Sequence, residues 1–144
     1  MAVGRRWASE EAQAQYRSDA ELAARFSELL AAAGEAEDRL REAQANRAPV
    51  QQQHELGKAF DGALTAAMRA AYAAERAEIG PRGYDDWIYR RKAKAKPKVR
   101  AWTAEAERLL TLRETHRLNE LSPLAIRRPA VSPGRPASPR QPAA

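Results

Sequence analysis

The chain has 144 residues, which is enough for one modest domain, and a net charge of +6. It has no cysteine, so disulfides and thiolate chemistry are excluded. No run of about 18 apolar residues occurs, and the N-terminus lacks the apolar segment of a secretory signal. We therefore expect a protein that is neither transmembrane nor secreted by a signal peptide, located in the cytoplasm or within a virus-like particle.

Alanine dominates the apolar content of the chain. It supplies 33 residues, more than half of the 44% that are hydrophobic, whereas Leu, Ile, Val and Phe together number only 21. Alanine favours helix but removes little apolar area from water when it is buried. The composition predicts an all-α fold of thin helices, which gain stability by packing on each other or on other protein subunits.

Two long helices are predicted over about residues 9–47 and 50–79, packed as an antiparallel hairpin. The first begins either near Ser9 or at Ser18, which forms a capping-box pattern with Glu21. Gly34 either ends this helix or lies within it at a cost of about 1 kcal/mol. Pro49 separates the two helices, and Gly80-Pro81 ends the second.

Each predicted helix carries apolar side chains at steps of three and four, and alanine pairs on the second allow close backbone approach. We expect residues 1–80 to make protein–protein contacts through this hairpin, in a homo- or hetero-oligomer. The large side chains predicted to pack there are Phe26, Leu30, Phe60, Leu64, Met68 and Tyr72.

Two shorter helices are expected within residues 81–122. Asp85 or Asp86 caps the first, which runs into a basic tract that Pro97 ends or kinks. The second extends from about Trp102 to Leu121. Residues 123–144 contain six prolines, four arginines and no acid, so they are predicted to form an extended tail.

Positive charge is concentrated in the second half of the chain. Residues 1–80 carry 10 basic and 13 acidic groups, net −3, and residues 81–144 carry 15 and 6, net +9. Residues 90–100 hold seven cations and no acid, with aromatic rings on both sides. Cations beside aromatic rings are typical of surfaces that bind phosphates or other polyanions. The residues predicted to bind are Arg90, Arg91, Lys92, Lys94, Lys96, Lys98 and Arg100, with Trp87, Tyr89 and Trp102, and with Arg127 and Arg128 of the tail.

Other interpretations of these residues remain open. In one of them, Trp87, Ile88 and Trp102 are the core anchors of the C-terminal helices and only the lysines are exposed. The tail arginines suit a solvated linker or a proline-rich peptide ligand equally well. Over seven residues, Lys92 to Lys98 resembles the Lys/Ala/Pro tails of linker-histone-like DNA-compacting proteins.

Nothing in the sequence indicates catalysis. His54 and His116 have no metal-spaced ligands around them, and helix capping accounts for Asp85-Asp86. Glycine-rich phosphate loops, nucleophile elbows and zinc patterns do not occur. We therefore expect no enzyme activity, no metal, no cofactor and no small-molecule substrate. Membrane-surface binding is disfavoured because the basic tract has few large apolar side chains to insert.

The sequence thus predicts a non-enzymatic structural or assembly protein of a nucleoprotein particle, such as a virion shell or connector component. Its helices would contact other subunits, while residues 90–100 and the tail would contact nucleic acid or an acidic neighbour. Two alternatives stay open: a free-standing, largely sequence-indifferent DNA- or RNA-binding packaging factor, and an adaptor that binds an acidic protein surface.

Overall fold

The computed structural model describes residues 8–121, which are helical throughout apart from short turns and contain no strand. This confirms the predicted all-α class. The predicted tail, with Arg127 and Arg128, lies outside the described residues. The helices are α1 (Glu10–Ala24), α2 (Phe26–Ala45), α3 (Val50–Ile79), α4 (Arg82–Asp85), α5 (Trp87–Ala93) and α6 (Pro97–Leu121).

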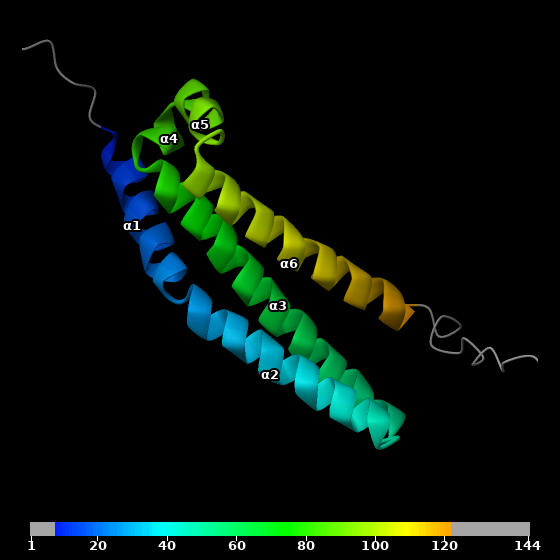
Figure 1. The fold of residues 1–144 in the computed structure, drawn as a ribbon. Coiled ribbons are helices and arrows are strands. Elements are labelled where there is room, and N and C mark those ends of the chain that lie inside the picture. Colours follow the sequence, from blue (N-terminus) through cyan, green and yellow to red (C-terminus); the bar gives the residue numbers. More distant parts are fainter. Residues whose placement is uncertain (1–7, 122–144) are drawn as a thin grey trace, which may run out of the picture.

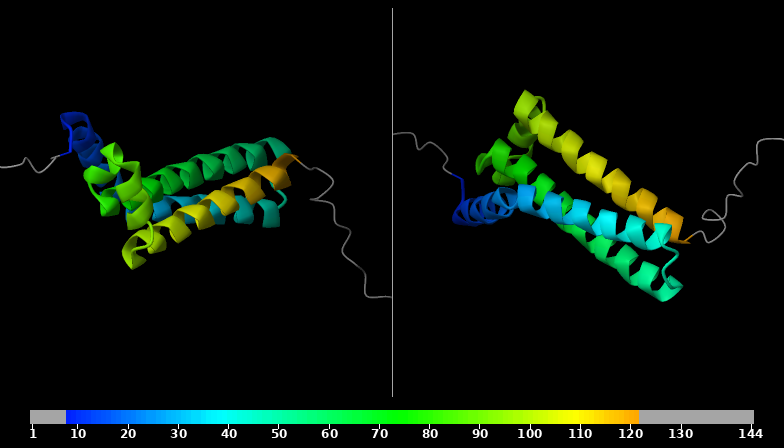
Figure 2. Two further views of the ribbon diagram at one scale, coloured as in Figure 1. Left: turned by 90° about the horizontal axis from the view of Figure 1, so that it is seen from above. Right: turned by 60° about the horizontal axis from the view of Figure 1, so that its bottom comes forward.

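The 30-residue helix α3 is the central element of the fold (Figure 1). Helices α1 and α2 together run antiparallel to it on one side, and α6 runs antiparallel to it on another. Figure 2 shows the same arrangement from two further directions. The short helices α4 and α5 sit at one end of this bundle, where the chain passes from α3 to α6. The bundle therefore has a compact helical head at one end.

The core lies between α2, α3 and α6. Leu64 and Leu109 are 2% and 1% exposed, and Ala67, Ala71 and Ala106 are completely buried. Because alanine has almost no side chain, these positions bring the helix backbones close together, so that modest apolar surface is enough to close the core. All six predicted packing residues lie in or against this core: Phe60, Leu64 and Met68 are buried, and Phe26, Leu30 and Tyr72 are partly buried. They thus already pack within the chain.

The first helical segment starts at the earlier of its two predicted positions. The Ser9 hydroxyl accepts a hydrogen bond from the Ala12 N–H at 3.1 Å, so Ser9 is the N-cap, and Ser18 lies inside α1. Gly34 lies inside α2. A break that the sequence did not indicate occurs at Arg25, whose N–H bonds to the Leu22 carbonyl at 3.0 Å. There the chain bends, so that α1 and α2 pack against different stretches of α3 (Figure 1).

The last helix begins earlier than expected, at Pro97 and not near Trp102. Proline is well suited to the first position of a helix, because its missing N–H has no partner there anyway. The basic tract is consequently not one helix that Pro97 interrupts. It spans the end of α5, the turn at residues 94–96 and the first turn of α6. The sequence-based boundaries were wrong in this region.

Candidate functional site

The candidate site is the basic corner, which we define as residues 87–100. It consists of α5, the turn that follows and the first turn of α6, and it lies at the head of the bundle (Figure 1). Two small side chains attach it to the fold: Ala93 is 2% exposed and Val99 is 1% exposed, and both pack against Ile79. With the chain buried at these two points, the residues between them turn outward.

All seven cations of the basic corner are exposed. None of them forms an ion pair with any of residues 8–121. Among these cations only Arg90 donates a side-chain hydrogen bond within residues 8–121, from its Nη1 to the Gly83 carbonyl at 3.4 Å, and the Lys96 ammonium lies 5.9 Å from the centre of the Tyr89 ring. The positive charge of the corner is therefore concentrated on one surface, where no acidic side chain of residues 8–121 forms an ion pair with it.

The two acidic residues nearest to the corner in the sequence, Asp85 and Asp86, bind elsewhere. Asp85 accepts hydrogen bonds from the Ser9 N–H at 2.7 Å and the Ser9 hydroxyl at 3.0 Å, which ties the start of α1 to α4. Asp86 caps α5 by accepting from the Ile88 and Tyr89 N–H groups. The bond from Tyr89 is the main reason that the pKa of Asp86 lies below its ordinary value. Neither acid neutralises the corner.

Helix stabilisation explains only part of this charge. Arg90, Arg91 and Lys92 lie in the last turn of α5, where the helix dipole favours cations. Lys98 and Arg100 lie in the first turn of α6, where the dipole disfavours them, and that turn contains no acid. Positive charge at a position where it weakens a helix suggests a role in binding.

The three aromatic residues around the corner have different environments. Trp87 is 61% exposed at the start of α5. Tyr89 packs against Ile79 and Val99, and its ring centre lies 4.6 Å from the guanidinium of Arg82. Trp102 is partly buried against the core, edge-on to Phe26 with ring centres 5.1 Å apart.

The two interpretations of the tryptophans, binding and core packing, thus apply to different residues. Core packing accounts for Trp102, as the alternative interpretation of the tryptophans held, whereas Trp87 projects into solvent. Arg82 lies outside the corner but contacts its Tyr89, although the sequence had not singled Arg82 out. A signal was present, because Asp86 follows Arg82 by four residues, and the two side chains pair at 3.5 Å.

A hydrogen-bond network centred on the Asp19 carboxylate lies next to Arg90 of the corner. Asp19 of α1 accepts from Arg76 Nε at 2.8 Å and Arg76 Nη2 at 3.0 Å, and from the Tyr84 hydroxyl. Burial pushes the pKa of Asp19 upward, but the hydrogen bonds from Arg76 and Tyr84 outweigh it, so this pKa lies below its ordinary value. Burial, and then the bond to Asp19, raises the pKa of Tyr84. The network joins α1, α3 and α4 beneath the corner.

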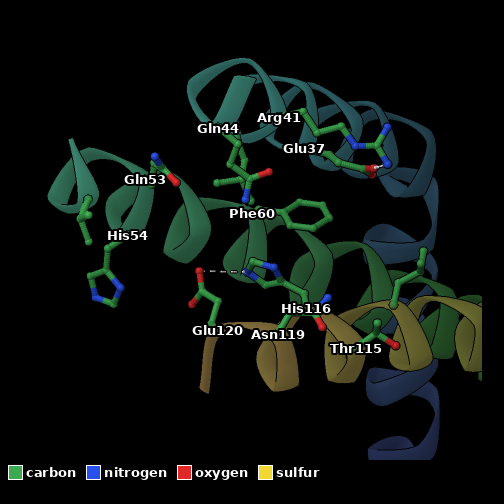
Figure 3. A pocket seen from close by; sticks show the side chains of 13 residues that line it. Glu37, Arg41, Gln44, Gln53, His54, Phe60, Thr115, His116, Asn119 and Glu120 are labelled. Atoms are coloured by element: carbon green, nitrogen blue, oxygen red, sulfur yellow. Dashed lines mark ion pairs between the residues drawn. The ribbon is translucent and has the colours of Figure 1, made fainter. Parts of the chain in front are cut away.

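An open groove of about 660 Å³ lies at the opposite end of the bundle, between α2, α3 and α6 (Figure 3). His116 Nε2 lies 2.8 Å from the Gly57 carbonyl, and its ring meets Phe60 edge-on with centres 4.9 Å apart. His54 lies apart from His116 on the groove wall in Figure 3. Within residues 8–121 no three His, Asp or Glu side chains are grouped closely enough to hold a metal ion. His116 has a structural role in fixing α6 to α3.

The chain matches no protein-family model, no curated protein and no solved structure. Among the described helices, none combines the length and the apolar composition needed to cross a membrane.

Proposed function

We propose that this protein is a non-enzymatic nucleic-acid-binding component of a nucleoprotein assembly, and that its basic corner binds the phosphate backbone without reading base sequence. The observation that carries the proposal is the group of seven exposed cations, without ion pairs among residues 8–121, on a corner whose backbone is anchored by Ala93 and Val99. Phosphate groups regularly spaced along a strand are the natural counter-charge for such a row of cations.

The geometry of the corner favours binding that is indifferent to sequence. Base readout in the major groove uses Arg, Asn or Gln along one face of a helix several turns long. Helix α5 has only seven residues, so it is about 10 Å long, and the corner contains no Asn or Gln. Most of its cations are lysines, which act as point charges on phosphate.

Assembly with other subunits is the second part of the proposal, and it concerns a different surface. The six side chains that the sequence assigned to protein–protein packing are used in the core of the chain itself. Large exposed apolar side chains lie at the end of the bundle far from the corner: Val50 is 82% exposed, Leu118 is 66% exposed and Leu112 is 41% exposed. We place subunit contacts there, which leaves the corner free for nucleic acid.

The test is the salt dependence of binding to two duplexes of unrelated sequence, measured by fluorescence anisotropy. If all seven cations contact phosphate, the slope of log K against log[salt] is about −6, and neutralising four lysines reduces it to about −3. The test variant is K92Q/K94Q/K96Q/K98Q. The matched control is R17Q/R39Q/K58Q/R69Q, which removes the same charge at four exposed positions on α1, α2 and α3.

We expect the control to keep the steep slope and both duplexes to bind alike. Equal loss of affinity in the two quadruple variants would show that only net charge matters, and would refute the assignment to the corner. A strong preference for one duplex would favour a sequence-specific regulator. Failure to bind any nucleic acid, with capture of an acidic protein that survives nuclease treatment, would favour the adaptor. Sedimentation analysis of a V50S/L118S variant tests the subunit contacts, which we expect it to weaken.

A further inference from the structure

We infer that the basic corner prefers single-stranded over double-stranded nucleic acid, and that Trp87 is the platform on which an unpaired base stacks. This inference rests on the proposed function, and it adds the class of nucleic acid and the residue that selects it. It starts from the exposure of Trp87, a large ring that the fold leaves 61% accessible although the other two aromatic residues of the region are packed.

Trp87 is held in place by the backbone on which it sits. It is the first residue of α5, and the Asp86 carboxylate accepts from the two N–H groups that follow, at 3.1 Å from Ile88 and 3.0 Å from Tyr89. Tyr89 in turn packs against Ile79 and Val99. A ring presented from a capped and anchored helix needs little ordering when a base binds, so less conformational entropy is lost.

Three cations lie on the same helix face as this ring. Arg90, Arg91 and Lys94 follow Trp87 by three, four and seven residues, which is the spacing of one helix face, and all four side chains are exposed. Lys94 has helical backbone angles, φ −60° and ψ −20°, so it continues the face of α5. One narrow strip of surface thus offers an aromatic face followed by three positive charges.

This combination fits a single strand better than a duplex. In a duplex both faces of each base are covered by neighbouring base pairs, and only phosphates are available to the corner. In a single strand a base can leave its neighbours and stack on the indole ring while the adjoining phosphates meet the cations. Stacking on an aromatic side chain changes affinity by roughly ten-fold or more per base, whatever the base.

The experiment compares a labelled oligothymidylate of about 20 nucleotides, long enough to cover a typical single-strand site, with a duplex of equal length, using the full chain. The variants are W87A, W87F, which keeps a smaller ring, and I88A, which removes the neighbouring apolar side chain that is 50% exposed. Because Trp87 is largely in solvent, its removal should leave the fold intact, which circular dichroism checks.

We expect W87A to weaken oligothymidylate binding about ten-fold and duplex binding less than two-fold, with W87F between wild type and W87A, and I88A close to wild type. The same loss on both ligands, or none on either, would overturn the inference while leaving the proposed function in place. Failure of the wild type to bind either ligand would refute both the inference and the proposed function.

An anionic membrane is the other surface that suits an exposed Trp-Ile pair among cations. If W87A and I88A both abolish binding to phosphatidylserine vesicles without changing oligothymidylate binding, the inference is wrong.

Discussion

Replacing Asp19 with alanine should loosen the attachment of α1 to the rest of the bundle. The Asp19 side chain is 15% exposed and accepts two hydrogen bonds from Arg76 and one from Tyr84, so D19A removes the group that joins three helices. A hydrogen bond to a charged group contributes about 1.5–3 kcal/mol to folding stability, whereas an exposed ion pair contributes about 0.2–1 kcal/mol. Arg76 is 44% exposed and regains water after the change. We therefore expect a loss of about 2 kcal/mol, which lowers Tm by roughly 6–10 °C for a chain of this size.

The pH dependence of this loss is a sharper test. In the folded protein the pKa of Asp19 lies below its ordinary value of 3.8. The stabilisation is therefore fully present above the unfolded-state pKa and disappears as the pH falls through the folded-state pKa. The difference in stability between wild type and D19A should be largest near neutral pH and should shrink as the pH falls below 3.8 through the folded-state pKa of Asp19.

Thermal unfolding followed by circular dichroism across this pH range measures both effects. The control is E21A, which removes an exposed acid from the same helix and should change stability by less than about 0.5 kcal/mol. Y84F keeps the ring of Tyr84 but removes its hydroxyl, and should cost about 1 kcal/mol. If D19A and E21A melt alike near neutral pH, or if the D19A deficit persists in acid, the network does not hold α1 as we describe.

Four further substitutions probe the helices of the bundle and their packing. G62A should raise the free energy of unfolding by about 0.5–1 kcal/mol in urea titrations, because Gly62 is helical with open space around it. G80A should lower the free energy of unfolding, because Gly80 has φ +96°, which alanine rarely adopts. A stabilising G80A would contradict this. T103V should lower the free energy of unfolding by about 1–3 kcal/mol in the same assay, because it removes the Thr103 hydroxyl that donates to the buried Glu75 carboxylate at 2.6 Å. A change below about 0.5 kcal/mol would show that Glu75 finds another partner. L109A should cost about 3 kcal/mol by calorimetry, because Leu109 is 1% exposed in the main core; a near-neutral result would mean that α6 is not seated there.

The longest helix could be predicted from the sequence because local backbone chemistry sets both of its ends. Pro49 stands just before its first residue, and Gly80-Pro81 follows its last, so α3 extends from Val50 to Ile79 as the sequence indicated. The all-α class follows equally from alanine content and helical periodicity. The concentration of positive charge at residues 90–100 is also a property of the sequence alone, because seven cations and no acid occur there.

The break at Arg25 could not be predicted in this way. No proline or glycine marks it, and Ala23, Ala24 and Arg25 are good helix formers. It arises because α1 and α2 must each lie against a different stretch of α3, which is a requirement of packing between distant segments. The start of α6 depends on the same kind of contact: the chain turns between Ala93 and Val99 because both are buried on Ile79.

The roles of the three aromatic residues beside the basic tract show where local information ends. Composition and spacing placed Trp87, Tyr89 and Trp102 together around the cations, and by themselves determined an all-helical chain with a cationic second half. Only the tertiary structure decided that Trp102 faces Phe26 in the core, that Tyr89 supports the corner and that Trp87 is exposed. The physical reason is that charge and helix propensity belong to short stretches of chain, whereas the burial of a side chain depends on which distant helix lies against it.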